Sequence, residues 1–199
     1  MMQITNKISY IKATDNPLSA DIGIVDGNKY CWIFDVGNCE EARLKLSDIQ
    51  KPKAVVLSHF HPDHIGNLDK ISWDKLYCSD NTFRYTKCGE IINTDCFFED
   101  GISLHLFKIP SCHAKGCIGM EIDSTYAFWG DAAYCTSKGG NSVYNTQLLL
   151  EQIKLLEKLP AKYIFLSHKE NLIHEKDSLL KFLCSIYDKR IQGEPYIYV

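Results

Sequence analysis

The chain has 199 residues, with 22 lysines and arginines against 25 aspartates and glutamates, so its formal net charge is −3 with the histidines neutral. A composition of 45% hydrophobic and 24% charged residues, with only 6 prolines and 12 glycines, excludes a disordered or collagen-like chain and is typical of one folded domain over residues 1–199. The slight acidic surplus argues against general nucleic-acid binding, because domains that hold a phosphate backbone carry excess positive charge.

No stretch approaches the roughly 18 uninterrupted apolar residues of a membrane helix, and the first residues lack the apolar core of a secretory signal. The nine cysteines are an odd number, scattered and without a C-x-x-C pair. This pattern favours free thiols over a disulfide framework or a thiolate zinc finger. We therefore expect a cytoplasmic protein with no membrane partner. The sequence does not indicate its oligomeric state.

Segments of the N-terminal third have the β-branched and aromatic composition of strands; they are residues 3–11, 20–25 and 29–36. The last two flank Asp26-Gly27-Asn28. Because glycine and asparagine accept the positive φ of a tight turn, this pattern predicts a β-hairpin.

A helix and a buried strand are predicted next. Asn38 is placed to cap a helix over about 40–49, which Pro52 would end. The run 54–57 is continuously apolar, as in a strand buried on both faces, and it leads directly into Ser58-His59.

The second half repeats this order. Strands are predicted over 118–122 and 126–129, the second ending in Gly130-Asp131, and a Gly- and Ser-rich loop follows over 136–142. A helix over about 145–158 then precedes a strand over 163–166 that leads into Ser167-His168. A helix over about 176–189 and an edge strand over 195–199 complete the predicted elements. Both halves thus contain a strand ending in Asp, a helix, and a strand ending in Ser-His, which indicates an internal duplication. If the halves pack as pseudo-symmetric sheets with helices outside, both Ser-His ends lie at the same edge.

The segment from Ser58 to Gly66 contains four residues of metal-ligand type. His59 and His61 are two apart, so in an extended chain their imidazoles point to one side, and Pro62 forces a turn that brings Asp63 and His64 round. Imidazole and carboxylate are the usual ligands of divalent metals. A solvated histidine loop is the alternative, but three further candidates stand at segment ends: His113, Asp131 and His168.

This ordered set of residues resembles the metallo-β-lactamase fold superfamily of binuclear metallohydrolases over nearly the full chain. The predicted fold is accordingly α/β, a four-layer αββα sandwich of two pseudo-symmetric β-sheets with helices on the outside. The resemblance implies two metal sites bridged by Asp131: His59, His61 and His113 would hold one ion, and Asp63, His64 and His168 the other. Asp35 matches an early Asp of the family that supports the histidine loop without binding metal; an ordinary turn former is the alternative.

The ligand types distinguish branches of the superfamily. An Asp at 131, where antibiotic-hydrolysing members with a Cys ligand carry that Cys, makes the site similar to glyoxalase II, lactonases and phosphodiester-cleaving members. His61 replaces the Glu of flavodiiron proteins. Cys112 and Lys115 depart from the family's usual turn around His113. We expect Cys112 to be a small buried filler, with a soft metal ligand as the alternative.

The resemblance implies a hydrolase of a small-molecule ester, thioester, lactone or lactam. Two divalent ions, zinc first with iron or manganese as alternatives, would generate a bridging hydroxide as nucleophile. Asp131 would bridge the ions, and Asp63 could also accept or pass on a proton. The alternatives are a phosphodiesterase or nuclease, which would require a basic surface, and a non-catalytic metal-binding sensor.

Substrate choice would depend on loops over the metal edge. The candidates are 79–100 and 132–144, with Tyr134, Lys138 and Tyr144 as candidate contacts. His105 and His174 are expected to be structural or exposed.

Overall fold

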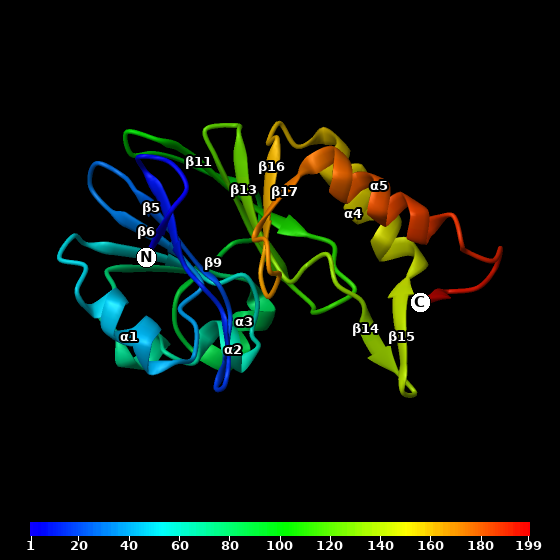
Figure 1. Ribbon diagram of the computed structural model, residues 1–199, viewed down its shortest axis with the longest axis horizontal. Helices are drawn as coiled ribbons and strands as arrows, with labels where there is room; N and C mark the ends of the chain where they lie inside the picture. The colour runs from blue at the N-terminus through cyan, green and yellow to red at the C-terminus, as the bar shows by residue number, and fades with distance from the viewer.

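Two large β-sheets pack face to face and helices cover the outer face of each, as the computed structural model of all 199 residues shows (Figure 1). The N-terminal sheet has the order β1 (Met2–Gln3), β2 (Ile8–Ile11), β5 (Ile22–Asp26), β6 (Cys31–Phe34), β7 (Lys53–Val56), β8 (Lys75–Cys78) and β9 (Glu90–Ile91). Its outer face carries α1 (Glu40–Ser47), α2 (Pro62–Ile65), the 3-10 helix η1 (Leu68–Lys70) and α3 (Asp80–Thr86).

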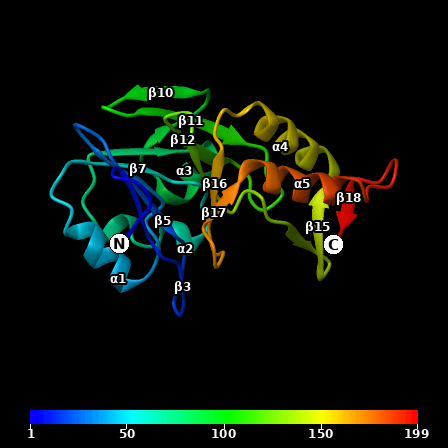
Figure 2. The same ribbon diagram turned by 45° about the horizontal axis from the view of Figure 1, so that its top comes forward.

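The C-terminal sheet lies against the inner face of the first and has α4 and α5 on its outer side (Figure 2). Its order is β10 (Cys96–Glu99), β11 (Ser103–Ile109), β12 (Cys117–Ile122), β13 (Tyr126–Gly130), β16 (Tyr163–Leu166) and β17 (Ile173–Glu175). The helices are α4 (Thr146–Lys158) and α5 (Lys176–Tyr187). The predicted four-layer α/β architecture, helices outside two sheets, is confirmed.

Three apolar cores separate these layers. The central core of 17 buried residues joins the two sheets, where the rings of Phe34 and Phe128 stack with centroids 5.4 Å apart. Cores of 15 and 20 buried residues lie under the N-terminal and C-terminal helices. Leu149, Ile153 and Leu156 contribute the apolar stripe predicted for α4.

The strand–helix–strand order occurs once in each sheet. Strands β6 and β7 are parallel and joined through α1, and β13 and β16 are parallel and joined through α4. The Ser-His pairs that follow β7 and β16 therefore leave the two sheets at one edge. This repeated topology is what an internal duplication would produce.

Two local predictions are wrong. The residue at the N-cap of α1 is Cys39, with no side-chain cap bond, because Asn38 is bound to the preceding β3–β4 hairpin (Thr14–Asp15, Leu18–Ser19) through its backbone N–H and the Ser19 Oγ, 2.8 Å apart. The predicted loop over 136–142 is instead a hairpin of β14 (Thr136–Lys138) and β15 (Asn141–Asn145).

That hairpin projects from the body of the molecule (Figure 1). Gly139 and Gly140 form its tip with φ of 58° and 81°, values that other residues adopt only with strain. The predicted C-terminal edge strand, β18 (Tyr196–Tyr198), pairs with β15 in a three-stranded sheet. The hairpin pairing itself is local, between residues 136–138 and 141–143, and β18, about 50 residues further along the chain, adds a third strand beside residues 143–145.

None of the helices has the length and apolar character that a membrane crossing requires.

Candidate metal centre

Seven residues of metal-ligand type meet at the shared edge of the two sheets. His59 follows β7, His61 precedes α2 as its N-cap, Asp63 and His64 lie in α2, His113 lies between β11 and β12, Asp131 follows β13, and His168 follows β16. They form two groups, one of His59, His61 and His113 and one of Asp63, His64, Asp131 and His168. In each group the ligand atoms lie within 4.8 Å of one another.

The local chain explains these positions. Pro62 occupies the first turn of α2, where its missing N–H is not needed, and this short helix turns Asp63 and His64 back toward the strand end. Gly130 precedes Asp131 with a φ of 57°, and a Cβ at this position would lie 2.9 Å from the Cβ of Ser58. The two sheets can therefore approach each other only if residue 130 is glycine.

Asp131 lies between the two groups. Its Oδ2 is 3.5 Å from Nε2 of His113 in the first group. The same oxygen is 3.3 Å from Nε2 of His64 and 3.7 Å from Nε2 of His168 in the second. A single carboxylate facing both groups is the arrangement that a bridging ligand requires.

Several ligand atoms lack any other partner. His59 Nε2, His64 Nε2 and Asp131 Oδ1 are buried and make no hydrogen bond. His61 Nδ1 and His113 Nε2 face each other at 3.1 Å. Buried polar atoms are rarely left unsatisfied, since each costs about 1–3 kcal/mol. A set of nitrogen and carboxylate donors around these atoms fits one or two divalent cations.

Asp35 supports this centre from behind. Its Oδ1 accepts a hydrogen bond from Ser58 N at 2.8 Å, and its Oδ2 accepts one from Ser58 Oγ at 2.7 Å. Oδ2 also lies 2.8 Å from Nδ1 of His64, which leaves Nε2 of that ring directed at the centre. Asp35 itself belongs to neither group and is fully buried. Its φ of 64° shows that it forms the turn as well.

Asp21 has a similar role that sequence reasoning missed. Its Oδ2 accepts hydrogen bonds from His168 N at 3.0 Å and Ser167 Oγ at 3.4 Å, and Oδ1 accepts one from Ala13 N at 2.9 Å. These bonds hold His168 at a φ of 60°. The available signal was an acidic residue at the start of the apolar run 20–25, which a strand assignment alone leaves unexplained.

The residues around His113 that depart from the family pattern stay outside both groups. Cys112 Sγ accepts a hydrogen bond from Asn145 N at 3.2 Å and packs against the outer core, and burial raises the pKa of its thiol to about 11. Cys112 is thus a partly buried filler next to the N-cap of α4. Lys115 is exposed.

Of the three predicted substrate contacts, only Tyr134 lies beside the metal centre. Tyr134 donates a hydrogen bond to the carbonyl of Ser167 and lies beside His113, with ring centroids 6.2 Å apart. Tyr144 instead donates to the carbonyl of Ala133, and Lys138 Nζ lies over the Tyr196 ring at 3.5 Å, so both are occupied away from the centre.

The two remaining histidines lie apart from the seven. His105, in β11, lies between Asp95 and Glu121 at 3.1 and 3.4 Å, which is the structural role expected of it. His174 is half-buried in β17.

Electrostatics differ between the two groups. Burial lowers the pKa of His59 far below its ordinary value and is also the main cause of the lowered pKa values of His61 and His113. Burial alone would lower the pKa of His64 too, but the Asp35 and Asp131 carboxylates raise it to about 10. The first group therefore offers neutral imidazole lone pairs, and the second has acidic neighbours that favour a positive charge.

The lowered pKa of His59 predicts acid sensitivity in the metal-free protein. The unfolded chain accepts a proton on this ring below about pH 6.5, whereas the buried ring does not, so stability falls as the pH falls below that value. Between pH 7 and pH 5 this one group should remove about 1–2 kcal/mol of unfolding free energy. The measurement is urea unfolding in chelator at pH 7 and pH 5. The unfolding free energy of His59→Gln should fall less between these two pH values, by that amount, than that of the unmodified protein. Equal losses in both proteins would contradict the assignment.

The fold and the residues at this edge agree with comparisons to known proteins. Residues 15–72 match the family model of the metallo-beta-lactamase superfamily, and that segment carries Asp35 and the ligand-type residues between 59 and 64. A metallo-beta-lactamase from Pontibacter korlensis superposes with a TM-score of 0.69 and 18% identity over 95% of this chain and 98% of that chain. The chain is therefore a metallo-β-lactamase fold protein, and the predicted resemblance is confirmed.

Other relatives show how widely this fold is used. A flavoprotein from Thermotoga maritima has a TM-score of 0.70 and 16% identity over 96% of this chain, which spans only 64% of that protein. The chain is also 25% identical over 187 residues to a hydroxyacylglutathione hydrolase from Psychromonas ingrahamii, covering 85% of this chain and 72% of that protein. The superfamily consists mostly of hydrolases.

Proposed function

We propose that the protein is a binuclear metallohydrolase that cleaves an ester, thioester, lactone or lactam of a small molecule. The observation that carries this proposal is the position of Asp131 between two groups of ligand atoms at one edge of the sandwich. The relationship to a hydroxyacylglutathione hydrolase supports hydrolysis of an acyl bond.

The seven ligand-type residues would hold two divalent ions. His59, His61 and His113 would hold one divalent ion, Asp63, His64 and His168 the other, and Asp131 both. Such ions lower the pKa of water and polarise a substrate oxygen, and zinc suits this nitrogen and oxygen donor set first, with iron or manganese as alternatives.

Asp63 and Asp35 have different tasks in this proposal. The Asp63 carboxylate is 13% exposed at its side chain and lies 2.9 Å from His168 Nε2. This partial exposure suits it to accept a proton from the attacking water and pass it to solvent. Asp35 stays behind the centre and fixes the orientation of the His64 ring.

Charge and cysteine content bear on the class of substrate and on the compartment of the protein. A phosphodiesterase or nuclease is less well supported, because the net charge is −3. The nine cysteines are all unpaired, which supports a reducing compartment such as the cytoplasm. The proposed partner is a small-molecule substrate, without a membrane partner.

Removing one ligand from each group should separate the two ions. We expect the protein to bind two divalent ions per chain, His61→Ala to lose the first and His168→Ala the second, each with at least about a hundredfold loss of kcat/KM. His105→Ala, a histidine outside the centre, should retain both ions and full activity. The measurements are elemental analysis and rates on chromogenic esters, thioesters, lactones and bis-nitrophenyl phosphate.

The outcomes distinguish the alternatives. Turnover of the phosphodiester alone would favour the nuclease class, and two bound ions without any turnover would favour a sensor. Full ester hydrolysis in saturating chelator would refute the proposal.

A further inference from the structure

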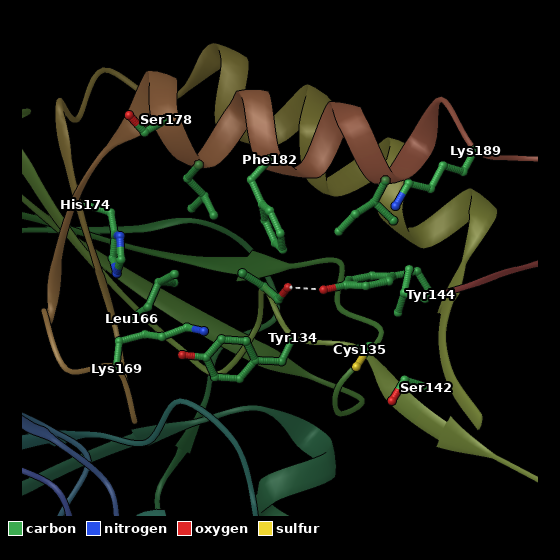
Figure 3. Close-up of a pocket in the computed structure, with 14 residues that line it drawn as sticks. Tyr134, Cys135, Ser142, Tyr144, Leu166, Lys169, His174, Ser178, Phe182 and Lys189 are labelled. Atoms are coloured by element: carbon green, nitrogen blue, oxygen red, sulfur yellow. Dashed lines mark hydrogen bonds between the residues drawn. The ribbon is translucent and has the colours of Figure 1, made fainter. Parts of the chain in front are cut away.

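A large cavity lies on the C-terminal side of the candidate metal centre. It is an open cavity with a volume of about 680 Å³, bordered by α5, β15 and the ends of β16 and β17 (Figure 3). Nine of its 14 lining residues are hydrophobic. A volume of this size accommodates a small molecule or a substantial part of one.

The cavity shares a wall with the metal centre. Tyr134 lines it, and the ring of the same residue lies 6.2 Å from the ring of His113. Lys169 also lines the cavity, directly after His168 in the chain, and its Nζ is 5.2 Å from the centre of the Tyr134 ring. A molecule reacting at the metal centre could therefore extend past Tyr134 into this space.

The charged side chains that line the cavity are all positive. Lys169 and Lys189 lie at opposite ends of it (Figure 3), and no aspartate or glutamate is among the lining residues. Between them, α5 presents Leu179, Phe182 and Ile186. The Phe182 side chain is a large apolar group that is still 53% exposed, so a ligand in the cavity would cover it.

We propose that the cavity binds the acyl portion of the substrate, an apolar chain of medium length that ends in an anionic group held by Lys189. Placing the scissile bond at the metal centre rests on the proposed hydrolase function. Binding of an anionic chain in the cavity does not, so it can be measured separately.

Direct binding tests the cavity without turnover. Isothermal titration with octanoate as the probe is expected to show saturable binding in both metal-loaded and chelated protein. Lys189→Met should raise the Kd for octanoate about three- to fivefold, with no change for 1-octanol, and Phe182→Ala should raise the Kd for both about fivefold. Lys181→Met, an exposed lysine of α5 that does not line the cavity, is the matched control and should bind like the unmodified protein.

Several results would overturn the proposal. They are an absence of octanoate binding, binding that requires metal and ignores Lys189 and Phe182, and a dimer in sedimentation analysis that closes this face and excludes octanoate.

Ester hydrolysis tests the substrate class. For 4-nitrophenyl esters, kcat/KM should rise about tenfold from acetate to octanoate and further to the half-ester of octanedioic acid. Lys189→Met should lower the rate for the half-ester about three- to fivefold relative to octanoate, and Lys181→Met should not. If octanoate binds as expected but no ester, thioester or lactone is cleaved, binding of an anionic chain in the cavity stands and the hydrolase proposal fails. If esters are cleaved without dependence on chain length or charge, the hydrolase stands and the cavity proposal fails.

Discussion

Asp131→Asn is expected to reduce hydrolysis by about 10²–10³-fold or more and to lower the metal content from two ions to one or fewer per chain. The carboxylate lies within 3.3–3.7 Å of imidazole nitrogens from both groups, so in the proposed binuclear site it is the one ligand whose charge would serve both ions. The amide keeps the shape of the side chain but loses the negative charge. Elemental analysis and steady-state rates on the same ester measure both effects.

The control for this variant is Asp123→Asn. Asp123 lies in the exposed turn between β12 and β13, at a φ of 47° that asparagine tolerates well. It should keep both ions and full activity. Two bound ions with undiminished rates in Asp131→Asn would contradict the bridging role.

The second large effect is expected from Asp35→Asn, although this residue touches no metal in the proposal. An amide has only one acceptor oxygen, so it cannot accept all three bonds that the carboxylate now receives, from Ser58 N, Ser58 Oγ and the Nδ1 side of His64. Loss of this support should weaken metal binding and activity about 10- to 100-fold. A buried unsatisfied group should also lower the unfolding free energy by about 1–3 kcal/mol.

A second buried carboxylate separates positioning from simple destabilisation. Asp100 accepts hydrogen bonds from Lys29 N, Tyr30 N and the Trp32 indole, away from the metal centre. Asp100→Asn should destabilise the fold with unchanged metal affinity. Competition with a chromophoric chelator, and the nitrogen resonances of the His64 ring, should respond only to Asp35→Asn. Equal metal affinities in the two variants would reduce Asp35 to a structural residue.

Much of the framework could be predicted because it depends on local patterns. The buried strand before His59, the amphipathic α4 and the hairpin of β5 and β6 follow from periodicity and turn residues over a few positions. The capping prediction failed because a distant partner decided the outcome. Asn38 is held by Leu18 and Ser19 of an earlier hairpin. The locally paired β14–β15 hairpin is extended into a sheet by β18, which pairs with residues 143–145.

The candidate metal centre also combines features set by local sequence with features set by tertiary contacts. Ligand chemistry and spacing are local, so the order of histidines and aspartates along the chain indicated which residues could take part, and the family resemblance implied that Asp35 would support them. The resemblance implied that Asp131 would bridge the two groups, and the structure supplies the distances. The tertiary structure alone decided that Asp21 holds the turn at His168 and that a cavity lies behind Tyr134. These features join residues as much as 147 positions apart, and their separations depend on how the two sheets pair and pack, which short-range pattern does not encode.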